Sequence, residues 1–200
     1  MKENNAIWAS ATHKARIQAL ESFIPYLNCG IDRAAESMML AVKGWRGEAE
    51  EAGGKPLSGF DGKALERAFE RLEWTTDTWC GILLTPVGAE PLNGDHLRRF
   101  IEILDPTVIV ALDDAAYRAL SEVLSEAFVG NISNEVSLRQ NSIEVSPKQN
   151  PKTTDAQGRL LVSVNGFEAA LNSLNLEADK QRVWWQLKQA SRAEALKRLR

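Results

Sequence analysis

Short apolar runs alternate with longer amphipathic stretches through most of the chain, and this alternation predicts its secondary structure. The apolar runs have the length of buried strands, and they cover Met38–Val42, Thr78–Leu84, Thr107–Leu112 and Leu160–Val164. The third run is the cleanest, because it is rich in β-branched residues, as expected of a strand buried on both faces. Alternating strands and helices favour the α/β class, here a three-layer α/β/α sandwich with a small, mainly parallel four-stranded sheet.

The amphipathic stretches predict helices, because their apolar residues recur at helical spacing. The predicted helices span about Ala6–Tyr26, Lys63–Leu72, Asp95–Leu104, Asp114–Ala127, Phe167–Leu174 and the chain from Glu177 onward. Residues 130–158 are polar and irregular, with Ser142–Ser146 as a candidate edge strand. We expect a single domain over residues 1–200, with an N-terminal helix within residues 1–30.

Composition and charge bound the function only loosely. A net charge of −3 gives no global basic signature, so any nucleic-acid surface has to be local. The two cysteines, Cys29 and Cys80, are too few for a four-thiolate cluster, and we expect them to be reduced thiols. No metal and no cofactor are predicted. The polar N-terminus and the lack of a long apolar run predict a cytoplasmic, monomeric protein without membrane contact.

The stretch Val42–Gly62 combines six glycines with charged side chains of both signs, and it connects a predicted strand to a predicted helix. In parallel sheets, ligands bind at the carboxyl ends of the strands. We therefore expect the loops at these ends to converge, and they are Lys43–Gly62, Thr85–Asp95, Asp113–Asp114 and Asn165–Gly166.

The motifs of this chain resemble those of the uracil-DNA glycosylase superfamily, nearest to its iron–sulfur-containing bacterial and archaeal branch. The similarity covers Met38 to about Ser191. Its first signature is the sequence VKGWRG at Val42–Gly47, followed by Glu50-Glu51 and by GKPLSGFDG at Gly54–Gly62. Its later strand and last loop correspond to Pro106–Leu112 and to Val164-Asn165-Gly166. The resemblance implies a DNA glycosylase, which flips a base out of DNA and hydrolyses its N-glycosidic bond.

The chain departs from the family at the positions that recognise and excise uracil. Gly44 replaces a carboxylate or amide that helps water attack the sugar, and Leu57 replaces the aromatic ring that stacks on uracil. Ile82 occupies the position of an asparagine that in the family reads the base edge, and Asn165 occupies the position of a histidine. The cluster cysteines are missing. Two explanations fit: an enzyme for another base, such as a damaged base or a hypermodified base of phage DNA, and an inactive module that binds DNA. A third class, a nucleotide-binding α/β protein, lacks a complete phosphate-binding motif.

The catalytic candidates are Asp61, Glu48 and Asn165. Either carboxylate could stabilise the positive sugar or orient a water, while the Asn165 amide could donate a hydrogen bond to the departing base. The alternatives are a helix N-cap for Asp61, a solvated charge for Glu48 and a turn residue before Gly166 for Asn165. Asp113 is predicted either to contact base or sugar or to cap the following helix.

The remaining candidates are DNA contacts. Ser58, Gly59 and the main chain near Gly62 suit a phosphate beside the flipped nucleotide. Lys43, Arg46 and Lys55 could add positive charge, and Trp45 either stacks on a base or packs over the loop. Gly44, Leu57, Ile82, Asp113 and Gly166 complete the predicted binding set.

Overall fold

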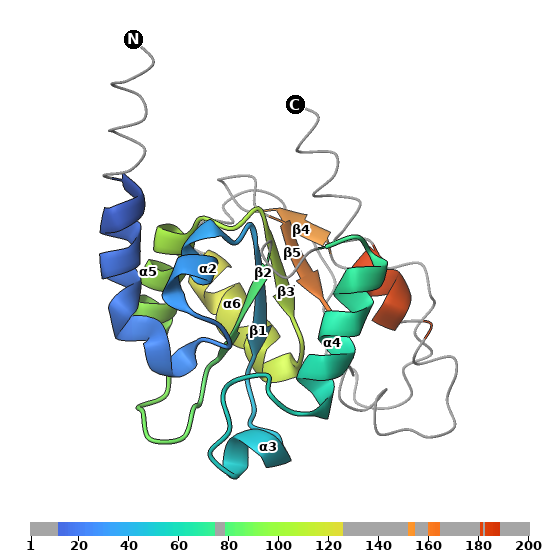
Figure 1. Cartoon of the computed structure of the whole chain (residues 1–200). Coiled ribbons are helices and arrows are strands. Elements are labelled where there is room, and N and C mark those ends of the chain that lie inside the picture. The colour runs from blue at the N-terminus through green and yellow to red at the C-terminus, as the bar shows by residue number, and fades with distance from the viewer. Residues whose placement is uncertain are drawn as a thin grey trace.

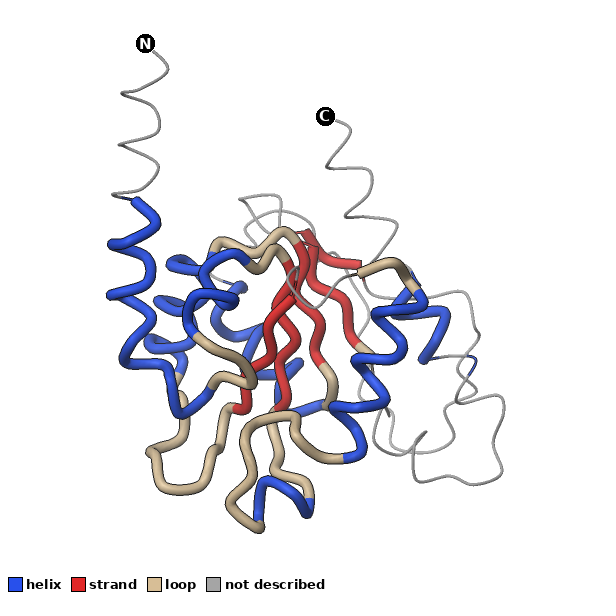
Figure 2. Tube along the Cα trace, in the orientation of Figure 1, coloured by secondary structure: helices blue, strands red, loops and turns tan. Residues whose placement is uncertain are grey.

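The computed structural model describes residues 12–74, 79–125, 152–154, 160–164, 181 and 183–188. Within these residues, helices surround one β-sheet, as Figures 1 and 2 show. The α/β class predicted from the sequence is therefore confirmed. No helix in this part of the chain is long and apolar enough to cross a membrane.

The sheet has five strands in the order β2-β1-β3-β5-β4. Their bounds are β1 Met39–Lys43, β2 Trp79–Leu83, β3 Val108–Ala111, β4 Lys152–Thr154 and β5 Leu160–Ser163. Parallel pairing joins β1 to β2 and to β3, and β3 to β5, whereas β4 pairs with β5 in the antiparallel sense. The prediction of four strands was wrong, because β4 is three residues long and its sequence, KTT, has no apolar pattern. The candidate edge strand Ser142–Ser146 lies outside the described residues.

Three long helices agree with the sequence pattern, and two of the three short ones were not predicted. The long helices are α4 Phe60–Arg71, α5 Gly94–Leu104 and α6 Asp114–Ser125. The short ones are the 3₁₀ helix η1 Glu21–Tyr26, α2 Ile31–Glu36 and α3 Glu48–Glu51. Helices of four to six residues carry too few apolar positions for their period to be seen. The predicted helix Ala6–Tyr26 is helical over residues 12–20 and then tightens into η1, which contains Pro25.

The apolar core lies on both faces of the sheet, because successive side chains of a strand point to opposite faces. In β1, Leu40 and Val42 pack with residues of η1, α2, α5 and α6. Met39 and Ala41 pack on the other face with residues of α4 and with Val183 of the helical residues 183–188. Figure 1 shows α2, α5 and α6 on the side of the sheet opposite to α4. Helices therefore cover both faces of the sheet.

Three of the tryptophans differ in their burial. Trp74 and Trp79 are buried, and both pack around the ring of Phe69. Trp184 is 36% exposed. The buried stripe of this helix is formed by Val183 and Leu187, so Trp184 points away from it.

The start of α4 lies unusually close to the glycine-rich loop. A Cβ atom built on Gly62 would stand 1.8 Å from the carbonyl oxygen of Leu57. Leu57 itself has a φ of 55°, which is uncommon for a residue other than glycine. The loop therefore reaches its position only because Gly62 lacks a side chain.

We predict that Gly62→Ala destabilises the protein by about 3 kcal/mol, because the new methyl group would overlap main-chain atoms that cannot move alone. The matched control is Gly94→Ala in α5, where the added Cβ would make an ordinary contact of 3.7 Å with Val123. Urea unfolding of the two variants measures the difference. Equal stability of both variants would contradict the close packing of loop and helix.

Candidate functional site

A buried lysine organises the edge of the sheet where β1 ends. Lys43 is the last residue of β1 and is only 3% exposed. Its Nζ atom lies 3.1 Å and 3.2 Å from the two carboxylate oxygens of Glu50, and it also forms an ion pair with Oδ2 of Asp61. A buried ammonium group is tolerated only when it is paired and hydrogen-bonded. One strand, the short helix α3 and the start of α4 therefore meet at a single cation.

Glu50 uses both of its carboxylate oxygens to hold the glycine-rich loop. One oxygen accepts a hydrogen bond from the backbone N–H of Gly47 at 2.7 Å, and the other accepts one from Leu57 at 2.9 Å. The side chain is 1% exposed. Glu50 thus joins the beginning and the end of the loop around α3, and its role is structural.

Asp61 lies in the first turn of α4, where it faces Lys43. The N-cap residue of α4 is Gly59, so the alternative reading of Asp61 as the N-cap is wrong. Its side chain is 13% exposed, and among the described residues Oδ1 accepts no hydrogen bond. Within the described part of the chain, Asp61 is therefore held through one carboxylate oxygen only.

The electrostatics of this cluster favour charged groups. Burial alone lowers the pKa of Lys43, but the hydrogen bonds and negative charges of Asp61 and Glu50 outweigh it and raise this pKa above its ordinary value of 10.5. Lys43 is consequently protonated at neutral pH. One positive and two negative side chains leave the cluster with a net charge of −1, which suits the stabilisation of a neighbouring positive charge.

Three of the four predicted loops converge at this edge, and Figure 2 shows them as tan segments next to the ends of the strands. The carboxylate of Asp113 accepts hydrogen bonds from the N–H groups of Gly44 at 2.7 Å and Trp45 at 3.3 Å. The Thr85 hydroxyl donates to the carbonyl oxygen of Gly44 at 2.9 Å. The expected convergence is thus confirmed for these loops. The fourth loop, with Asn165 and Gly166, lies outside the described residues.

Asp113 also caps the helix that follows it. Its Oδ1 atom accepts a hydrogen bond from the N–H of Ala116 at 2.7 Å, and α6 begins at the next residue, Asp114. Of the two readings offered by the sequence, helix capping is the confirmed one. With both oxygens bound to backbone donors, this carboxylate is occupied.

The position of Gly44 has no space for a side chain. A Cβ atom built there would lie 2.6 Å from both Ala115 Cβ and Asp113 Oδ1, and 2.8 Å from the backbone nitrogen of Ala116. A carboxylate or amide at this position would require α6 to begin elsewhere. Gly44 is therefore part of the contact between two loops. This contact leaves no space for a catalytic side chain at position 44.

Leu57 and Ile82 do not line one pocket, which corrects the prediction that both bound the base. Leu57 is 7% exposed and belongs to the core on the α4 face, with its Cδ1 atom 2.2 Å from a Cβ built on Gly81. Ile82, next to Gly81 in β2, is completely buried in the core on the opposite face. Successive side chains of β2 point to opposite faces of the sheet, so the sheet itself lies between Leu57 and Ile82.

The other predicted loop residues are mostly exposed. Glu48, Arg46, Lys55 and Ser58 are exposed, Gly59 is half-buried, and Trp45 is 63% exposed. Trp45 therefore does not pack over the loop. Phe60, the first residue of α4, is 69% exposed and was not predicted. Its place between Gly59 and Asp61, outside any apolar run, is the signal by which sequence reasoning could have found it.

Glu50 is the principal residue that sequence reasoning missed, because it was noted only as one of an acidic pair. The signal was its spacing: Glu50 lies three residues after Gly47, the N-cap position of α3, from which a glutamate can reach back to the N-cap N–H. In the described part of the chain, no group of three or more histidine, cysteine, aspartate or glutamate side chains could hold a metal ion.

No protein-family model and no curated protein sequence matches this chain. The functional argument therefore depends on the site itself.

We predict that Lys43→Met destabilises the protein by about 3–5 kcal/mol at pH 7, because two buried or half-buried carboxylates lose their shared cation. The matched control, Lys63→Met, replaces an exposed lysine of α4 and should change stability by less than about 0.5 kcal/mol. Urea unfolding gives both values. A loss equal to that of the control would show that the buried ion cluster contributes nothing.

The same cluster predicts a dependence on alkaline pH. Because the pKa of Lys43 is raised in the folded state, its stabilisation is present in full below the unfolded value of about 10.5 and is lost as the pH rises through the folded value. The difference in stability between wild type and Lys43→Met should therefore shrink above pH 10.5 and stay constant from pH 7 to 9. A difference that grows with pH would contradict this sign.

Proposed function

We propose that the chain is a DNA glycosylase related to the uracil-DNA glycosylase superfamily, with the three-layer α/β/α arrangement of that group, which excises a modified base other than uracil. The observation that supports the proposal most is Asp61, a half-buried carboxylate at the carboxyl edge of a parallel pair of strands, bound through one oxygen to the buried ammonium group of Lys43. The edge is also the meeting point of three loops.

The proposed chemistry is hydrolysis of the bond between C1′ of the sugar and the base nitrogen. The bonding electron pair leaves with the base, and the sugar becomes oxocarbenium-like until a water oxygen adds to C1′. The added water then loses a proton to solvent, and the departed base anion takes up a proton from solvent. Asp61 stabilises the positive sugar or orients the water through its open oxygen. Lys43 fixes the carboxylate in place. Asn165 keeps its predicted role as a hydrogen-bond donor to the departing base, a role that requires no proton transfer.

Asp61 is the better choice among the carboxylates of this edge because the others are occupied or exposed. Glu50 and Asp113 each accept hydrogen bonds from backbone N–H groups through both oxygens. Glu48 is exposed to solvent, where its charge is screened. We therefore replace the pair Asp61 and Glu48 by Asp61 alone in the carboxylate role.

The preference against uracil follows from Gly44 and Leu57. Gly44 cannot be replaced by the carboxylate or amide that the family uses, and the Leu57 side chain is part of the apolar core. A site without the family's polar base readers discriminates by shape, so a bulky or hypermodified base is the proposed substrate. We further propose that the protein acts as a cytoplasmic monomer, in repair or in defence against phage DNA.

DNA contact is assigned to the exposed residues of the same edge. Trp45 and Phe60 offer aromatic surfaces for stacking, and Arg46 and Lys55 offer cations for phosphates. These cations also offset the negative charge of the Lys43 cluster, which would otherwise repel the DNA backbone. Ser58 and the N–H groups near Gly59 are placed beside them in sequence.

A second candidate function, an inactive module that binds DNA, is favoured by one observation: the absence of space at Gly44. A chain that had lost the water-activating side chain could close the gap by packing its loop on α6. The two candidates share the DNA surface and differ only in base release.

We predict that the purified protein leaves abasic, alkali-labile sites in DNA that carries its substrate base. The screen uses uracil, hypoxanthine, modified cytosines and phage DNA with hypermodified bases. Asp61→Asn should lower the rate of base release by about 100-fold or more while DNA binding is retained. Glu48→Gln is the matched control and should keep the wild-type rate.

Two other outcomes would support the alternative functions. DNA binding without base release on every substrate would support the inactive module. A melting-temperature shift with nucleoside phosphates but not with DNA would support a nucleotide-binding protein.

DNA affinity should depend on salt through the loop cations. We predict that Arg46→Ala reduces the slope of log affinity against log salt concentration by about 0.7 to 0.9, the loss of one phosphate contact. The control is Arg71→Ala, since Arg71 is the last residue of α4 and lies at the end away from the loop. Identical slopes for the two variants would remove Arg46 from the DNA surface.

A further inference from the structure

The two cysteines, which are 51 positions apart in the sequence, lie on either side of an antiparallel bridge between the segment after η1 and β2. Leu27 and Ile82 form an antiparallel bridge. Next to it, the N–H of Asn28 donates to the carbonyl oxygen of Gly81 at 2.9 Å, and the N–H of Gly81 donates to Oδ1 of Asn28 at 2.8 Å. Continuing this register by one residue would set Cys29 opposite Cys80. Side chains directly opposite each other in antiparallel segments have Cβ atoms about 4.5–5.5 Å apart.

The side chains of the two cysteines also share one environment. Cys80 is part of the apolar core that contains Leu27 and Ile82, and Cys29 packs against that core. Burial raises the pKa of Cys80, and the neighbouring Cys29 raises it further. Burial also raises the pKa of Cys29, while the charge and hydrogen bond of Arg33 act in the opposite direction. Both thiols thus belong to the same apolar core, beside the bridge between Leu27 and Ile82.

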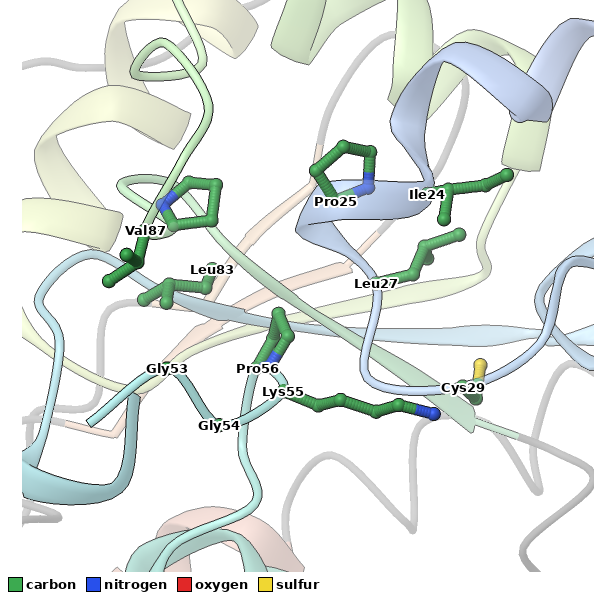
Figure 3. A pocket seen from close by; sticks show the side chains of 11 residues that line it. Ile24, Pro25, Leu27, Cys29, Gly53, Gly54, Lys55, Pro56, Leu83 and Val87 are labelled. Atoms are coloured by element: carbon green, nitrogen blue, oxygen red, sulfur yellow. The ribbon is translucent and has the colours of Figure 1, made fainter. Parts of the chain in front are cut away.

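Cys29 can be reached from solvent and Cys80 cannot. Cys29 is half-buried and lines a cavity of about 350 Å³ between η1, the loop Gly53–Pro56 and the chain after β2 (Figure 3). Cys80 has no exposed surface. Lys55 is the one charged side chain among the residues that line this cavity, and Figure 3 shows it extended along the wall toward Cys29. A small anionic reagent would therefore meet Cys29 first.

We propose that Cys29 and Cys80 form an oxidisable dithiol, which a small anionic disulfide converts to an intramolecular disulfide through attack at Cys29. The thiolate of Cys29 attacks one sulfur of the reagent, forms a mixed disulfide and releases the first reagent thiol. The thiolate of Cys80 then attacks the Cys29 sulfur and releases the second reagent thiol. The two cysteines lose two protons and two electrons, and the reagent disulfide is reduced to two thiols.

Oxidation would tie the segment after η1 to β2 beside Gly81. Gly81 is the residue whose open space is filled by the Leu57 side chain of the glycine-rich loop. The disulfide would therefore fix the wall against which this loop packs. The inference depends on the cysteines and the cavity alone, and not on the proposed reaction with DNA.

The test uses the full chain and glutathione disulfide as the reagent. After incubation, the remaining thiols are alkylated, and intact mass and peptide mapping identify the products. Wild type should lose both thiols and give a Cys29–Cys80 cross-linked peptide that disappears on reduction. Cys80→Ser should trap one glutathione on Cys29, and Cys29→Ser should take up none, because Cys80 is buried. Melting temperatures of the reduced variants establish that each is folded.

A matched pair of lysine variants tests the route to Cys29. Lys55→Ala should slow the uptake of glutathione in the Cys80→Ser background severalfold, whereas Lys63→Ala, outside the cavity, should not change it. Two results would overturn the proposal: wild type that retains both thiols, and wild type that gives only glutathione adducts or cross-links between chains. A glutathione adduct on Cys80 of Cys29→Ser that forms as fast as the adduct on Cys29 would also overturn it.

Discussion

The pairing of the buried Lys43 ammonium group is the constraint on which the rest of the site depends. A cation at the end of a central strand is stable only if carboxylates reach it. Glu50 reaches the ammonium group from the short helix α3, and Asp61 reaches it from the first turn of α4. The glycine-rich loop between them must then follow a narrow path, which explains the positive φ of Leu57 and the missing side chain at Gly62.

The same constraint distinguishes the two carboxylates that accept backbone hydrogen bonds through both oxygens from Asp61. The carboxylate of Glu50 accepts hydrogen bonds from the loop, and that of Asp113 accepts one from the first turn of α6. Asp61, in contrast, has one oxygen without a hydrogen-bond partner among the described residues. The contact of Gly44 with α6 and the burial of Leu57 belong to this packing as well. A site of this kind gains a preorganised, ionised carboxylate and loses the side chains by which uracil is read in the family that the motifs resemble. This combination is the physical basis for proposing a different base.

The sequence predicted those features that depend on local patterns. The β-branched run at β3, the long amphipathic helices and the cap at Asp113 follow from periodicity and capping preferences, and the convergence of loops follows from parallel strand order. Features that depend on tertiary contacts were missed. Whether Glu48 or Glu50 meets Lys43 depends on the four-residue helix α3, and a one-residue change of register in β2 decides which face Ile82 occupies. The proximity of Cys29 to Cys80 depends on a bridge that no pattern indicates.

We propose above all that the carboxyl edge around Lys43 and Asp61 is a DNA-binding surface. Hydrogen–deuterium exchange with and without DNA carrying a stable abasic-site analogue tests it most directly. We expect slower exchange of amides in residues 44–62 and 113–116 on binding, with no change in α2 and α5 on the far face of the sheet. Binding that leaves residues 44–62 unprotected, or protects α2 and α5 instead, would contradict the account.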